Sequence, residues 1–133
     1  MRLVLLGLTF LALLSCSEEK EQTVFEYVCQ EVEAEYGTPC GDLGPPLPVL
    51  TQVLNFVKGG PWMGAYVGGE RYVFVNPISP DIRGSLMHET VHYVLYNVAD
   101  VGTDKQCESE EVARRIAGQT GDKWREKYGC ADT

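Results

Sequence analysis

Histidine and positive charge are scarce in this chain of 133 residues. It holds two histidines, and its 11 lysines and arginines face 19 acidic residues, so the net charge is −8 at pH 7. This balance argues against a nucleic-acid partner, because an acidic surface repels a phosphate backbone. No two cysteines have the C-x-x-C spacing of a cysteine zinc site. Beyond residue 14, no apolar run approaches the roughly 20 residues that a membrane-spanning helix needs.

The composition is that of one globular domain. Hydrophobic residues make up 44% of the chain and charged residues 23%, which is usual for a folded protein and unusual for a disordered one. The length is too short for two ordinary domains. The core of such a domain is modest, and small domains often gain stability from disulfides or a bound metal.

The first 16 residues have the pattern of an export signal. Arg2 supplies a positive charge, and residues 3–14 form an apolar run. A stable span needs about 20 residues, so this run indicates a signal segment. Leu13-Leu14-Ser15-Cys16 resembles a bacterial lipobox, in which the cysteine is lipidated and becomes the first residue. The alternative is an ordinary signal peptide that happens to contain a cysteine.

We therefore expect a lipoprotein signal peptide over 1–16, a polar tether over 17–23 and a folded domain over 24–133. The protein would be exported and anchored in the bacterial cell envelope, facing the periplasm or the cell surface, through lipid on Cys16. Export also predicts an oxidising environment, in which the four other cysteines form two disulfides. Three pairings are possible, and we favour the two that close local loops. These are Cys29–Cys40 and Cys107–Cys130.

Apolar periodicity predicts several helices. The central one, over 79–98, carries apolar residues on most faces, which is typical of a buried helix. Ser79 suits its N-cap and Pro80 its first position. The other expected helices span 24–36, 107–119 and 122–128.

Turn residues and alternating apolar residues predict a β-hairpin. Residues 62–67 and 70–75 flank Gly68-Gly69, a two-residue turn that accepts positive φ. Residues 49–57 fit either a short helix or a strand, and we favour the helix. Helices and a hairpin together predict an α+β fold.

His88-Glu89-Thr90-Val91-His92 is an H-E-x-x-H motif, and it contains both histidines of the chain. Side chains four residues apart lie one above the other on a helix, so the two imidazoles can bind one metal ion. Glu89 lies about 100° around the helix, where its carboxylate can reach a water on that ion. Zn²⁺ is the metal that this arrangement favours. Accidental histidine spacing is the competing interpretation.

A catalytic zinc site needs a third protein ligand, and the next helix offers Glu108, Glu110 and Glu111. Eighteen residues separate His92 from Glu111, which is the spacing of the aminopeptidase branch of the gluzincins. The helical wheel favours Glu110, because it lies beside Ala113 at the edge of the apolar face, whereas Glu111 lies almost opposite. Spacing and helical geometry therefore disagree, and both glutamates stay candidates.

The motif at residues 88–92, followed by Glu110-Glu111-Val112-Ala113-Arg114-Arg115-Ile116-Ala117, resembles the HExxH…ExxA(D/N)xxA pattern of gluzincin-type metallopeptidases. The pattern occurs in the CAAX prenyl endopeptidase group and in ImmA/IrrE-type peptidases. The resemblance implies a zincin-like fold, with a small antiparallel sheet, an active-site helix and a downstream ligand-bearing helix.

The same resemblance implies the chemistry of the site. Zinc would be bound by His88, His92 and Glu110, and Glu89 would activate water to hydrolyse a peptide or protein substrate. An exposed edge strand of the sheet would bind the substrate in extended form. The chain departs from the family at Arg114, where an Asp or Asn usually supports a zinc-bound histidine, so another group must orient the histidines.

Other functions and other site residues stay open. A non-catalytic envelope lipoprotein could use the metal structurally, or keep a relic site for binding a partner. An amidase acting on cell-wall peptides would share the zinc site. Tyr93 and Tyr96 are candidate oxyanion donors, although packing is the commoner role of such tyrosines. The same alternative applies to the candidate specificity residues Trp62, Met63 and Tyr66.

Overall fold

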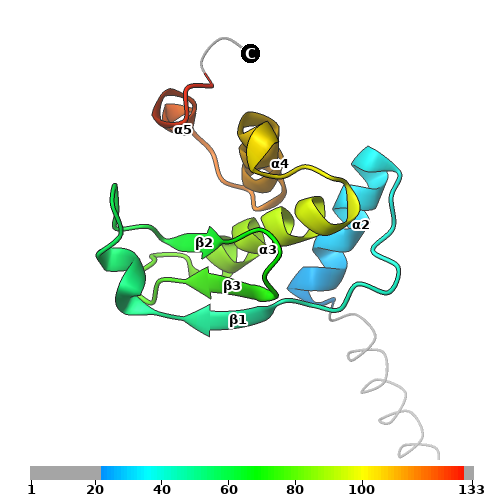
Figure 1. Cartoon of the computed structure of the whole chain (residues 1–133), viewed down its shortest axis with the longest axis horizontal. Coiled ribbons are helices and arrows are strands. Elements are labelled where there is room, and N and C mark those ends of the chain that lie inside the picture. Colours follow the sequence, from blue (N-terminus) through cyan, green and yellow to red (C-terminus); the bar gives the residue numbers. More distant parts are fainter. Residues whose placement is uncertain (1–21, 131–133) are drawn as a thin grey trace, which may run out of the picture.

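The structure is a computed structural model that describes residues 22–130. The predicted signal peptide, Cys16 and most of the predicted tether lie outside these residues. Within these residues, four α-helices and a three-stranded sheet form a mixed α+β fold (Figure 1). The helices are α2 (Val24–Tyr36), α3 (Ile82–Val98), α4 (Gln106–Ile116) and α5 (Lys123–Lys127). The strands are β1 (Leu47–Leu50), β2 (Gly64–Tyr66) and β3 (Tyr72–Val75), and 3₁₀ turns span Gln52–Asn55 and Thr103–Lys105.

Helix α2 has the bounds predicted from its apolar periodicity. The side chain of Thr23 accepts a hydrogen bond from the Glu26 backbone N–H at 3.1 Å, which caps the first turn. Gly37 ends the helix in the left-handed region, with φ of 72°. The last residue of the predicted tether is therefore part of the helix start.

The sheet is mixed, whereas an antiparallel sheet was predicted. β2 and β3 form the predicted antiparallel hairpin, in which Glu70 N–H donates to the Val67 carbonyl at 3.1 Å across the Gly68-Gly69 turn. β1 pairs in parallel with the other side of β3. β1 was missed because its second half overlaps the start of the segment for which a helix was favoured. Pro48 lies in it, and proline suits an edge strand.

The favoured helix over 49–57 is correct for only one turn. Leu50 ends β1, Thr51 accepts a hydrogen bond from Val53 N–H at 3.2 Å, and a 3₁₀ turn follows. The apolar residues of this segment do not share a buried face, because only Leu54 is buried. Val53 and Phe56 are exposed instead.

Helix α3 lies at the centre of the fold, as its apolar pattern predicted. It packs against α2, α4 and the inner face of the β2–β3 hairpin (Figure 1). Val91, Val94 and Leu95 are fully buried in it. The core consists of Val28, Val32, Val73, Val91, Tyr93, Val94, Leu95, Val101, Val112 and Ala113.

The start of α3 is two residues later than the Ser79-Pro80 cap predicted. Asp81 is the N-cap, and its carboxylate accepts a hydrogen bond from Gly84 N–H at 2.9 Å. Aspartate outcompetes serine here because a charged acceptor also interacts favourably with the helix dipole. The Ser79 hydroxyl accepts from Asp81 N–H and contacts the Ser85 hydroxyl at 2.8 Å.

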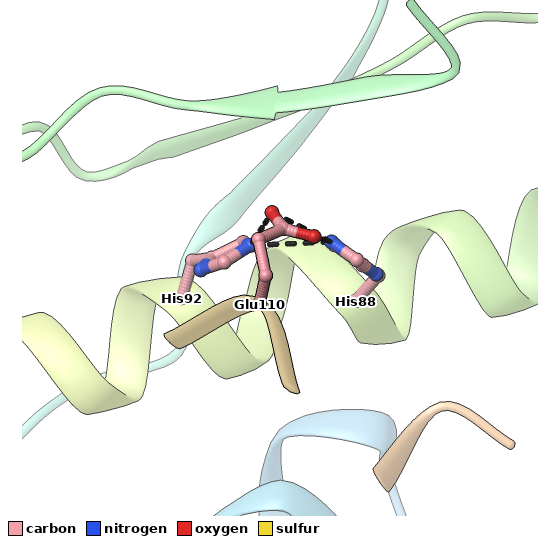
Figure 2. A group of neighbouring side chains, drawn as sticks. All are labelled: His88, His92 and Glu110. Carbon is pink, nitrogen blue, oxygen red and sulfur yellow. Dashed lines mark hydrogen bonds and ion pairs between the residues drawn. The ribbon is translucent and has the colours of Figure 1, made fainter. Parts of the chain in front are cut away.

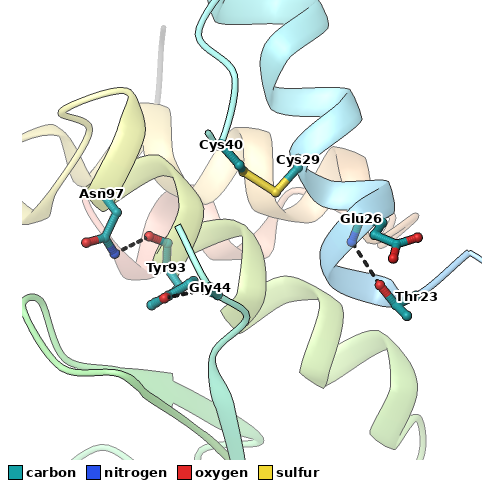
Figure 3. The surroundings of a disulfide bond; sticks show 7 residues. All are labelled: Thr23, Glu26, Cys29, Cys40, Gly44, Tyr93 and Asn97. Carbon is teal, nitrogen blue, oxygen red and sulfur yellow. Dashed lines mark hydrogen bonds between the residues drawn. A yellow bond between two sulfur atoms is a disulfide. The ribbon is translucent and has the colours of Figure 1, made fainter. Parts of the chain in front are cut away.

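Two disulfides are present, with the predicted pairing. Cys29–Cys40 joins α2 to the loop that leads to β1 (Figure 3). Cys107–Cys130 joins the first turn of α4 to the residues after α5, so it keeps α5 close to α4. The predicted three-segment organisation of the whole chain stays a prediction. Within residues 22–130, none of the helices has the length and hydropathy that crossing a bilayer requires.

Candidate metal centre

Helix α3 presents both histidines of the chain to the same point. His88 and His92 are one helical turn apart, and their Nε2 atoms are 3.2 Å from each other. Both residues line a cleft, and His88 is 8% exposed. Local helix geometry alone produces this arrangement, which is why the sequence motif predicted it.

Glu110 is the third member of the cluster. Its carboxylate lies 2.9 Å from His92 Nε2 and 3.3 Å from His88 Nε2 (Figure 2). Of the three candidate glutamates, the structure brings Glu110 to the histidines, as the helical wheel favoured. Glu111, favoured by spacing, is exposed and lies 3.6 Å from the Arg125 guanidinium instead, and Glu108 is exposed as well.

The three side chains can hold one metal ion, since their ligand atoms all lie within 4.8 Å of one another. Ligands bound at about 2.0–2.1 Å in a tetrahedral site are about 3.3–3.4 Å apart. The observed separations of 3.2, 3.3 and 2.9 Å are close to that value. Two imidazoles and one carboxylate are also a usual donor set for catalytic zinc.

Hydrogen bonds behind the histidines favour metal binding. The Gln119 carbonyl oxygen is 2.7 Å from His88 Nδ1, and such an oxygen can only accept, so His88 Nδ1 carries a proton. In the neutral ring, His88 Nε2 is then an acceptor that faces the Glu110 carboxylate, another acceptor. A proton on Nε2 or a metal ion between these two groups removes the conflict.

His92 has its own supporting residue. The Ser109 hydroxyl lies 2.6 Å from His92 Nδ1 and immediately precedes Glu110 on α4. Ser109 and Gln119 therefore contact the outer nitrogens of the two histidines, a role that the gluzincin pattern gives to an Asp or Asn at position 114. Sequence reasoning recognised that a substitute was needed and did not find either residue. Ser109 could have been predicted, because it is next to Glu110 in the sequence. Gln119 lies beyond the end of α4, and no sequence pattern pointed to it.

If the cluster binds a metal ion, we expect Gln119→Ala to weaken that binding by about 10- to 100-fold, because loss of the outer hydrogen bond frees His88 to rotate and to change tautomer. Competition against a chromophoric chelator measures this change. Gln30→Ala, on the exposed face of α2, is the matched control and should leave affinity unchanged. Equal affinities of the two variants would show that Gln119 does not orient His88.

The electrostatics of the cluster follow from burial and close opposite charge. Burial acts to lower the pKa of His88, and the hydrogen bond and charges of Glu110 and Glu89 raise it above its ordinary value. Burial acts to raise the pKa of Glu110, but His88 and His92 hold it far below its ordinary value. Glu110 is therefore a carboxylate at neutral pH, which is the form that binds a metal.

Glu89 lies beside the cluster and outside it. Its side chain passes under β2, where a Cβ on Gly64 would lie 2.7 Å from Glu89 Cγ. The residue is 7% exposed, and its carboxylate makes no hydrogen bond within residues 22–130. Burial is the main cause of its raised pKa. A carboxyl group with raised proton affinity is suited to general-base catalysis.

The cluster opens into a cleft of about 650 Å³. Residues of β2, α3 and α4, and residues in and after α5, line this cleft. The predicted specificity residues line it on the β2 side: Trp62, Met63 and Tyr66. Tyr128, which follows α5, also lines the cleft, and sequence reasoning did not single it out.

The two predicted oxyanion donors have different positions. Tyr96 lines the cleft one turn beyond His92. Tyr93 does not, because it is buried in the core and its hydroxyl donates to the Gly44 carbonyl at 2.7 Å (Figure 3). Packing, which was the commoner role expected for such tyrosines, is therefore the role observed for Tyr93, and Tyr93 is no longer a candidate oxyanion donor.

Comparison with family models, with curated proteins and with solved structures finds no match for this chain. The fold and the site are thus interpreted from their own geometry.

Proposed function

We propose that this protein is a zinc-dependent peptide-bond hydrolase of the gluzincin type, with a minimal zincin-like fold. The observation that carries the proposal is the meeting of His88, His92 and Glu110 in an open cleft, with Glu89 beside them and not among them. A structural zinc site is closed by four protein ligands, whereas a catalytic site has three and an open position. The three-residue cluster fits the second kind.

Zinc in this site would polarise a carbonyl group and lower the pKa of a bound water towards about 7. Glu89 would then take the proton from the attacking water and deliver it to the leaving amine. Its burial against Gly64 restricts its position and raises its proton affinity. Tyr96, at the rim of the cleft, can donate a hydrogen bond to the developing negative charge.

The substrate would be an extended peptide. β2 is an edge strand, because it pairs with β3 on one side and has no strand partner on the other among residues 22–130. It also forms a wall of the cleft. A peptide added to this edge would pass over the cluster and gain main-chain hydrogen bonds. We also propose, from the N-terminal sequence, that the enzyme works in the cell envelope as a lipoprotein anchored through Cys16.

Digestion of a randomised peptide library tests the proposed function. We expect the zinc-loaded protein to cleave peptides, the chelator 1,10-phenanthroline to stop cleavage, and added zinc to restore it. Cleavage that is insensitive to the chelator would point to a contaminating or metal-independent activity. Zinc-loaded protein that cleaves no peptide would favour a structural metal in a binding protein.

A further inference from the structure

Arg114 lies on the wall of the cleft next to the metal cluster. It follows Glu110 by one turn of α4, so both side chains belong to the same face of the helix. Its side chain lines the cleft and is partly buried. The position is also the one at which the sequence departs from the family pattern, where an Asp or Asn would support a histidine.

The Arg114 guanidinium has no partner within residues 22–130. Its Nε atom is buried without a hydrogen bond, and it forms no ion pair. The other arginines of this region are engaged: Arg115 pairs with Glu35 of α2, and Arg125 lies 3.6 Å from Glu111. A guanidinium stays charged at any physiological pH, so burying part of it without a partner costs free energy.

The acidic side chains that line the cleft do not compensate for this charge. Glu110 is held by the two histidines, Asp81 accepts a hydrogen bond from Gly84 N–H, and Glu89 lies under β2. Lys127 adds a second positive charge on the same wall as Arg114. Arg114 and Lys127 are the two basic side chains among the described residues that line the cleft.

We propose that Arg114 binds a carboxylate group of the substrate, so that the cleft selects peptides carrying an acidic group near the cleaved bond. This rests on the proposed peptidase function. A guanidinium presents a planar pair of N–H donors that matches a carboxylate. The carboxylate can belong to the C-terminus of the peptide or to an Asp or Glu side chain, and both have the same chemistry.

The role is compatible with the rest of the site. Position 114 is free to bind substrate because Gln119 and Ser109 already support the histidines. Tyr128 also lines the cleft, and the charge of Arg114 opposes the rise in the pKa of Tyr128, a rise caused mainly by burial.

Matched peptides test the proposal with the full chain, purified in detergent and loaded with zinc. One pair of libraries differs only in a C-terminal acid or amide, and a second pair differs in Glu or Gln at one internal position. We expect kcat/KM to favour the acid form of at least one pair by about tenfold or more. Arg114→Gln should remove that preference, chiefly through KM, and Arg114→Lys should restore part of it.

Arg115→Gln is the matched control, because its guanidinium pairs with α2 outside the cleft, and it should keep the preference. Preference in the first pair identifies a C-terminal subsite, and preference in the second a side-chain subsite. Equal cleavage of acid and neutral peptides by the unaltered protein would overturn the role of Arg114 and leave the peptidase function standing.

If no peptide is cleaved, a binding experiment distinguishes failure of the proposed carboxylate site from failure of the proposed peptidase function. The same libraries then carry a fluorescent label. Zinc-loaded Glu89→Gln protein is added to them, and binding is followed by fluorescence anisotropy. Tighter binding of acid peptides that depends on Arg114 would establish the carboxylate site without the peptidase function. Equal binding of acid and neutral peptides would overturn it.

Discussion

Replacing Glu89 by glutamine is expected to lower kcat by about 10²- to 10⁴-fold while zinc stays bound, since a positioned general base contributes rate on that scale. Glutamine has nearly the same shape as glutamate, so it fits the space beneath β2 beside Gly64. It cannot accept the proton of the attacking water. Zinc remains because the metal cluster is formed by His88, His92 and Glu110.

Turnover of the best library peptide and zinc content would be measured on the same preparation of Glu89→Gln protein. Glu108→Gln is the matched control, because Glu108 is exposed in the first turn of α4. It should keep both activity and zinc. A Glu89→Gln protein that retains zinc and near-normal kcat would exclude Glu89 as the base.

Glu110→Gln is expected to weaken zinc binding by more than the 10- to 100-fold that loss of an outer hydrogen bond typically costs. The carboxylate supplies negative charge as well as a ligand atom, and an amide supplies no charge. Loss of zinc should also lower the melting temperature measured with zinc present, because a ligand that binds the folded state stabilises it.

The neighbouring Glu111→Gln variant is the matched control for Glu110→Gln. Both substitutions remove one charge from the same turn of α4, and the structure places only Glu110 at the histidines. Glu111→Gln should therefore keep zinc affinity and the zinc-dependent shift in melting temperature. Loss of zinc from Glu111→Gln, with zinc retained by Glu110→Gln, would show that Glu111 is the ligand that the gluzincin spacing indicates. It would contradict the assignment of Glu110.

The candidate site was predictable where local helix geometry determines it. His88, Glu89 and His92 lie within two turns of one helix, so their spacing alone fixes their relative positions. Glu110 was harder to predict, because the loop between α3 and α4 determines which glutamate of α4 faces the histidines. The apolar face of α4 supplied that information, since Val112 and Ala113 are buried against the core.

The features that were missed depend on contacts between distant segments. Gln119 contacts His88 although the two residues are 31 positions apart in the sequence, and the periodicity of apolar residues does not predict such a contact. Tyr128 faces the cleft through the position of α5, which Cys107–Cys130 helps to maintain. The parallel pairing of β1 with β3 was missed for a related reason, because a four-residue strand contains too few positions to distinguish it from a helical turn.

The zinc content of the chain from residue 17 onward, purified without chelators, tests the metal site most directly. Elemental analysis should find about one zinc per chain, as a single three-ligand site requires. His88→Ala should abolish this zinc, because it removes one of the three ligands at the centre of the cluster. No zinc in the unaltered protein after reconstitution, or an equal amount in the His88→Ala variant, would contradict the proposed metal centre and the peptidase function that depends on it.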